Sequence, residues 1–110
     1  MHASIPLTNE EGAIACVLRI TRSTEGRVQV CKTTEAGAVM GATVDVSSEA
    51  FHSLEHLGFG QTCWLPTQDE PQFRMTGQGK VIEVRENRAS AEPLFIAQEA
   101  LSCALIHLHN

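Results

Sequence analysis

Short apolar runs separated by turn-forming residues recur along this chain, and their length and spacing constrain its fold more than any other feature. Ala13 to Ile20 is a nearly continuous run rich in branched residues, and in Arg27 to Lys32 the two valines share one face. A repeat of two residues is typical of a half-buried β-strand, and runs this short favour strands over helices. On the same grounds we predict a turn at Gly26 and further strands at residues 39–46, 61–65, 73–75, 80–85 and 94–96.

Two segments depart from the strand pattern. Ala50, Leu54 and Leu57 recur at helical spacing behind Ser47 and Ser48, whose hydroxyls can accept the first free N–H groups of a helix. Residues 47–57 are therefore predicted to form a short helix. From residue 97 onward an amphipathic helix is predicted, with an apolar face made of Ala100, Leu101, Ala104, Leu105 and Leu108.

Together these elements predict a mainly β fold with α-helices. We expect a small antiparallel β-barrel or curved sheet, with one short internal helix and a C-terminal helix that covers an open end. At 110 residues the chain fits a single domain spanning residues 1–110, and a domain of this size buries roughly 65% of its unfolded surface.

The excess of acidic residues indicates which classes of partner this chain can bind. There are 13 acidic residues against 8 Lys and Arg, and aromatic residues make up only 5% of the chain. Nucleic-acid surfaces need clustered cations and rings on which bases can stack, so no nucleic-acid partner is expected. A protein partner is expected instead, and the apolar face of the C-terminal helix leaves a homodimer open.

The cysteines and the N-terminus bear on location. Cys16, Cys31, Cys63 and Cys103 are scattered and form no C-x-x-C pair, which predicts buried, reduced thiols. The N-terminal residues lack the cationic and apolar regions of a signal peptide, and no apolar stretch approaches the roughly 18 residues that span a bilayer. We predict a cytoplasmic protein without membrane insertion and, because no specific cofactor motif is present, without a cofactor.

One pair of histidines has the spacing of metal ligands. In H52-S-L-E-H56 two imidazoles lie one helical turn apart, which allows His52 and His56 to bind one Zn²⁺, and the H-x-x-E-H order occurs in one class of metalloproteases. A third ligand would have to come from Cys63, His107 or His109. The alternative is two solvent-facing histidines opposite the apolar stripe. No nucleophile elbow is present, and the paired carboxylates lie in polar turns, so no enzymatic activity is expected.

A second candidate site combines Arg22 and Arg27 with Asp45 and Ser47. With D45-V-S47, G60-Q-T-C-W-L-P and G79-K-V-I-E-V, the chain resembles the PilZ domain over about residues 22–108. PilZ domains are small bacterial barrels, many of which bind cyclic di-GMP through an R-x-x-x-R arm and a D/N-x-S-x-x-G turn. Here four residues separate the arginines, Ala50 replaces the glycine, and a helical pattern follows Ser47. The resemblance implies the fold more directly than the ligand.

A further similarity, to the molybdate-binding Mop or TOBE barrels, involves G37-A-V-M-G-A-T-V44 and G60-Q-T-C63 within about residues 12–66. We therefore expect a non-enzymatic regulatory or adaptor module, built on a PilZ-like barrel, that acts through protein–protein contacts. Three alternatives stay open. They are a cyclic di-GMP receptor using Arg22, Arg27, Asp45 and Ser47, a zinc-binding protein using His52 and His56, and an oxyanion-binding barrel.

Overall fold

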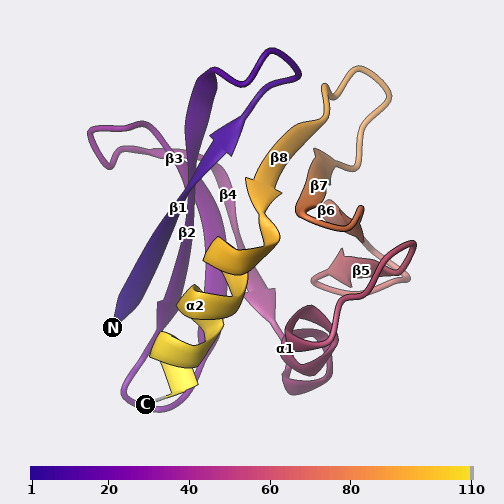
Figure 1. The fold of residues 1–110 in the computed structure, drawn as a ribbon. Coiled ribbons are helices and arrows are strands. Elements are labelled where there is room, and N and C mark those ends of the chain that lie inside the picture. The colour runs from indigo at the N-terminus through magenta and orange to yellow at the C-terminus, as the bar shows by residue number, and fades with distance from the viewer. Residues whose placement is uncertain (110) are drawn as a thin grey trace.

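The computed structural model describes residues 1–109 and has a mainly β architecture (Figure 1). Its helices are α1 (Ser48–Glu55) and α2 (Gln98–His109). The strands are β1 (His2–Thr8), β2 (Ile14–Arg22), β3 (Val28–Thr33), β4 (Val39–Val46), β5 (Thr62–Leu65), β6 (Phe73–Gly77), β7 (Val81–Glu86) and β8 (Leu94–Ala97). The predicted fold class, a curved antiparallel sheet with one short internal helix and a C-terminal helix, is confirmed.

The strands of residues 1–109 form one antiparallel sheet in the order β4-β3-β2-β1-β8-β7-β6-β5. The sheet consists of two meanders of consecutive strands, which we call the N-terminal meander (β1 to β4) and the C-terminal meander (β5 to β8). Strand β1 pairs with β2 along its length but with β8 only at Thr8 and Phe95. The edge strands β4 and β5 approach each other, so the sheet curls into a nearly closed barrel.

Strand β1 is the one element that the sequence analysis did not predict. It alternates as a half-buried strand should, with Ile5 and Leu7 in the core. It also contains Pro6, which lacks a backbone N–H. Because β8 pairs with β1 only at Thr8, Pro6 has no strand beside it on that side, and the missing donor is tolerated there.

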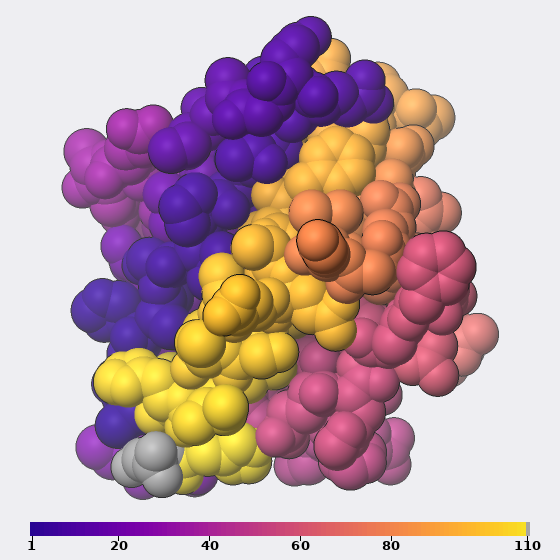
Figure 2. All heavy atoms as spheres, in the orientation of Figure 1, coloured from indigo at the N-terminus to yellow at the C-terminus, as the bar shows by residue number. Residues whose placement is uncertain are grey.

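Helix α2 packs across the seam between the two meanders, where it contacts β1, β2 and β8. In Figure 2 the yellow helix lies between the indigo N-terminal segment and the pink segment around α1, and its upper end adjoins the orange part of the C-terminal meander. Its buried residues are Leu101, Ala104, Leu105 and Leu108, which confirms the predicted apolar face. The helix therefore joins the two meanders beside β1 and β8, whose strand pairing is limited to Thr8 and Phe95. Within residues 1–109, neither helix is long and apolar enough to cross a membrane.

The cysteines divide into two groups. Cys16, Cys31 and Cys63 are buried and reduced, as predicted, whereas the prediction is wrong for Cys103, which is exposed. The reason is its place on α2, since Cys103 falls outside the stripe of residues that faces the sheet.

The three turns of the N-terminal meander share one pattern. The turns are residues 9–13, 23–27 and 34–38. In each, the N–H of the first residue donates to the carbonyl oxygen of the fifth residue. The fourth residue is a glycine, and its N–H donates to the carbonyl oxygen of the first residue. Each glycine has φ between 84° and 96°, a region that other residues rarely adopt. The side chain of the first residue also accepts a hydrogen bond from the fifth N–H, at 3.0 Å for Asn9 and at 3.1 Å for Ser23 and Thr34. The predicted turn at Gly26 is confirmed.

Candidate functional site

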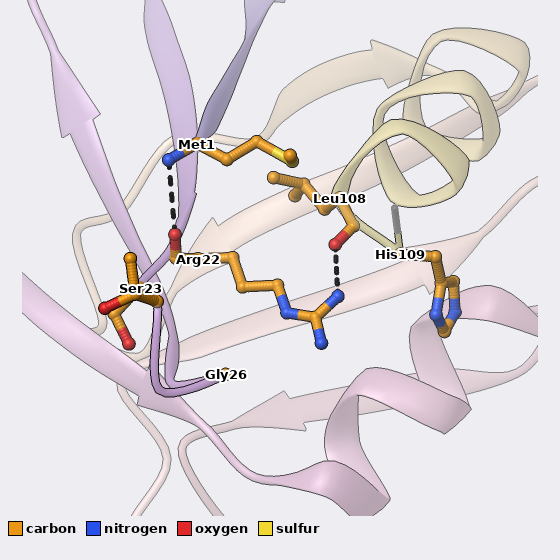
Figure 3. A pocket seen from close by; sticks show the side chains of 7 residues that line it. Met1, Arg22, Ser23, Gly26, Leu108 and His109 are labelled. Carbon is orange, nitrogen blue, oxygen red and sulfur yellow. Dashed lines mark hydrogen bonds between the residues drawn. The ribbon is translucent and has the colours of Figure 1, made fainter.

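Strands β2, β3 and β4 and both helices line a groove at the end of the sheet where β2 finishes (Figure 3). One cavity of about 420 Å³ and another of about 330 Å³ adjoin here, and Arg22, Gly26 and His109 line both. We call the two cavities together the Arg22 groove. The first is also lined by Ser23 and Leu108, and the second by residues of α1.

Arg22 is the last residue of β2, and its side chain reaches toward the final turn of α2 (Figure 3). Its Nη1 donates a hydrogen bond to the carbonyl oxygen of Leu108 at 2.5 Å. The last carbonyls of a helix have no partner within the helix and carry partial negative charge, so a guanidinium is well placed there. Arg22 thus fastens the end of α2 to the N-terminal meander, and its guanidinium forms part of the groove lining.

Ser47 lies at the other side of the groove, immediately before α1. Its Oγ accepts a hydrogen bond from the Ala50 N–H at 3.1 Å, so the predicted helix cap is confirmed. Ser47 also lines the second cavity together with Ser48 and Phe51. The structure therefore brings Arg22 and Ser47, two of the four predicted PilZ-like residues, to one cavity.

The other two predicted residues form a separate pair on the outer surface. Arg27 donates to both carboxylate oxygens of Asp45, from Nε at 3.1 Å and from Nη2 at 2.9 Å, and Gln29 donates to Asp45 at 2.9 Å. The strand register explains the pair, because Gln29 lies opposite Asp45 across β3 and β4. The hydrogen bonds from Arg27 and then Gln29 lower the pKa of Asp45. Neither Arg27 nor Asp45 lines the Arg22 groove.

The two candidate metal ligands, His52 and His56, are neighbours on α1. Their rings contact edge to face, with centroids 4.5 Å apart, and His52 lines the second cavity of the groove. His109, one of the candidate third ligands, instead pairs with Glu55 at 2.6 Å and contacts the Phe51 ring.

Within residues 1–109, the structure places no third ligand beside these two histidines. Another candidate, Cys63, is buried, and its Sγ donates to the Ala50 carbonyl oxygen at 3.7 Å. Burial raises the pKa of the Cys63 thiol, which disfavours the thiolate that zinc requires. Among residues 1–109, no group of three or more His, Cys, Asp or Glu side chains is arranged to hold a metal ion.

A surface that the sequence analysis did not single out surrounds Phe59, whose side chain is 83% exposed. The turn of residues 58–61 that carries it is fastened to β6. Gly60 N–H donates to the Gly77 carbonyl at 2.8 Å, and Gly77 N–H donates to the Gln61 carbonyl at 2.9 Å. The Gln61 side chain also accepts from the Gly58 N–H at 2.7 Å. The backbone under Phe59 is thus held in place while its ring faces solvent.

Two further apolar residues extend this surface. The Phe59 ring lies 3.8 Å from the position that a Cβ on Gly79 would occupy, in the turn that leads into β7. Val81 begins β7 and pairs with Ala97, and both are exposed. We call Phe59, Val81 and Ala97 the Phe59 face. The signal available in the sequence was an aromatic residue between two glycines, G58-F-G60.

No protein-family model, no curated protein and no solved structure matches this chain. The PilZ and Mop or TOBE resemblances therefore stay predictions, and the geometry of the Arg22 groove and the Phe59 face carries the functional argument.

Proposed function

We propose that this chain is a non-enzymatic regulatory or adaptor module that acts through protein–protein contacts made by the Phe59 face. The observation that supports this proposal is the 83% exposure of Phe59 on a turn whose backbone is hydrogen-bonded to β6. Covering an exposed aromatic ring with a partner lowers the free energy of the complex, and aromatic anchors carry much of the binding energy of protein interfaces. A backbone that is already ordered loses little entropy on binding.

The proposal is tested by affinity capture from extracts of the native cell with wild-type protein, Phe59→Ala and Val39→Ala. Val39 is a matched control because it is also exposed, at 54%, but lies at the start of edge strand β4. Since both side chains are largely in solvent, neither substitution should lower the melting temperature appreciably. The partner retained by wild type should be lost with Phe59→Ala and kept with Val39→Ala. Equal retention by both variants would contradict the proposal.

A second candidate function is supported by the meeting of Arg22 and Ser47 at one cavity. A guanidinium can make two parallel hydrogen bonds to a phosphate or a guanine edge, and a hydroxyl can satisfy a further polar atom. This arrangement favours the cyclic di-GMP receptor among the ligand-binding alternatives. The adjoining Arg27 and Asp45 pair, which is exposed, would have to open to take part.

The measurement for this candidate is the melting temperature with and without cyclic di-GMP, because a ligand that binds only the folded state raises it. Wild type should show a rise that Arg22→Ala loses. Because Arg22→Ala also frees the end of α2, the comparison is between ligand-induced shifts and not between melting temperatures. Lys80→Ala, which removes an exposed cation outside the groove, serves as the control. A flat titration of wild type removes this candidate.

A further inference from the structure

A second cleft opens at the end of the sheet opposite the Arg22 groove, where β2 begins. It has a volume of about 360 Å³, at the lower end of the range of about 300–1,000 Å³ found for small-molecule sites. Its floor consists of the core residues Cys16, Phe73 and Val84, with Met40 and Leu94 at the margin. Burial raises the pKa of the Cys16 thiol, as an apolar floor should.

Lys32 projects into this cleft from the inner face of β3. It stands in register between Leu18 of β2 and Met40 of β4, and Leu18 is a core residue. The ammonium group is paired with the Glu86 carboxylate of β7, in the other meander, and the Lys32 side chain is only 14% exposed. We call this hollow the Lys32 cleft.

A lysine on the inner face of a small barrel breaks the alternation that builds the core. Removing an ion pair from water costs free energy that its own attraction does not always offset, and an apolar side chain of similar length would fill the space. Departures of this kind are expected mainly at functional sites. Lys32 is therefore better explained by binding than by packing.

The charges in the cleft define the class of ligand. Glu86 is held by two cations, Lys32 and Arg88, and Arg88 Nε donates to it at 2.7 Å. Hydrogen bonds from Lys32, and then from Arg88, lower the pKa of Glu86, so the group is an anion at neutral pH. These three side chains together carry one net positive charge, and the exposed Glu92, which also lines the cleft, brings the whole lining to neutrality. One cation can thus be released to an anionic ligand while Glu86 keeps the other.

We propose that the Lys32 cleft binds a small amphipathic monoanion, a carboxylate with a short apolar tail. The tail lies against Met40, Phe73 and Leu94, and the carboxylate pairs with the Lys32 ammonium while Glu86 stays with Arg88. Lys32, Glu86 and Arg88 all keep a partner in the bound state, which avoids the largest penalty of a buried ionic site. A cationic ligand of the same shape would place its charge beside the Lys32 ammonium, which is only 14% exposed. This site is independent of the function proposed above.

The test uses hexanoate, with hexanol and hexylamine as probes with the same number of carbon atoms, and follows the methionine methyl signals by NMR. The chain has three methionines, and they lie in three different places. Met40 lines the Lys32 cleft, Met1 lines the Arg22 groove, and Met75 is buried. Hexanoate at millimolar concentration should shift the Met40 signal in a saturable way and leave Met1 unmoved.

Three variants separate binding from folding. Lys32→Gln should bind hexanoate about tenfold more weakly, because a charge-assisted hydrogen bond is replaced by a neutral one. Lys80→Gln, which removes an exposed cation from the turn before β7, should bind as wild type does. Lys32→Arg keeps the charge and should retain binding, which excludes a folding defect as the cause of the loss. The proposal is overturned if hexanol or hexylamine shifts Met40 as strongly as hexanoate, if Lys32→Gln binds normally, or if Met40 does not respond.

Discussion

Strand β2 has nine residues and β5 has four, and this contrast runs through the two meanders. The N-terminal meander has three turns of five residues each, and each turn is closed by backbone hydrogen bonds between its own residues. In the C-terminal meander the connection between β6 and β7 is short, but the other two, residues 66–72 and 87–93, are longer and depend on one another. Asn87, after β7, donates from its side chain to the Pro71 carbonyl at 3.0 Å and from its backbone to the Gln72 carbonyl at 2.9 Å.

The contrast separates a regular scaffold from the places where function can reside. Long strands with self-contained turns leave few polar groups for other uses, whereas irregular segments carry exposed or charged side chains on backbone that distant residues hold. The Phe59 face lies largely on the C-terminal meander, and Glu86 and Arg88 bring two of the charges of the Lys32 cleft from there. The N-terminal meander contributes Lys32 to this cleft and Arg22 to the Arg22 groove.

The largest expected effect tests whether close backbone packing holds the C-terminal meander. A Cβ on Gly77 would lie 2.2 Å from the Gly58 carbonyl oxygen, which belongs to the backbone and cannot turn aside. Gly77→Ala should therefore lower the free energy of unfolding by about 2–3 kcal/mol. Gly41→Ala is the control, since a Cβ there meets nothing within 4 Å and only the positive φ opposes it. Equal losses for both in urea denaturation would show that the contact is absent.

The next largest effect is expected from glycine substitutions that test whether the turns of the N-terminal meander contribute independently to stability. Gly12 and Gly26 have φ of 84° and 85°, and a Cβ at either position meets no atom closer than 3.9 Å. Each Gly→Ala substitution should cost about 1 kcal/mol, because the left-handed conformation is unfavourable for alanine. The turns lie at opposite ends of β2, so the double variant should show the sum of the two losses. A clearly non-additive loss would mean that the turns are coupled.

Local reasoning predicted strands in both halves. Strand β2 was predicted as a short apolar run rich in branched residues and β3 from the alternation of its valines, while short apolar runs between turn residues also indicated β4 and the four strands of the C-terminal meander. The helices α1 and α2 were predicted because their apolar residues recur at helical spacing. Strand β1 was not predicted, although the first of the three similar turns, N9-E-E-G12, follows it. A comparison of that turn with S23-T-E-G26 would have indicated a strand on its N-terminal side.

The site residues were less predictable, for a physical reason. Whether Arg22 and Ser47 meet depends on how α1 and α2 pack against the end of β2, and no local pattern contains that information. Arg27 and Asp45 pair because of the register between β3 and β4. The Lys32 and Glu86 pair joins strands that are not neighbours in the sheet.

A smaller effect concerns the side chain that closes each turn. Ser23 Oγ accepts from the Arg27 N–H, so Ser23→Ala leaves that exposed N–H to water. The expected loss is about 0.5 kcal/mol in the free energy of unfolding, since a net hydrogen bond at the surface contributes little. Thr24→Ala, one residue further along the same turn, should be close to neutral. A loss for Ser23→Ala as large as that for Gly26→Ala would mean that the hydroxyl, and not the glycine, determines the turn.

The smallest effect tests whether an ion pair links the two meanders. The hydrogen bond from Lys32 holds the pKa of Glu86 below its ordinary value of 4.5. A lowered pKa in the folded state means that the contribution is complete above the unfolded value and is lost as the pH falls through the folded one. Between about pH 5 and pH 3, wild type should therefore lose more stability than Glu86→Gln, which has no carboxylate to protonate. Glu10→Gln, in the first turn of the N-terminal meander, controls for the loss of one carboxylate and should keep the wild-type acid profile. If Glu86→Gln follows wild type through the whole range of acid denaturation, the pair contributes nothing, and α2 and the β1–β8 contact must hold the meanders together without it.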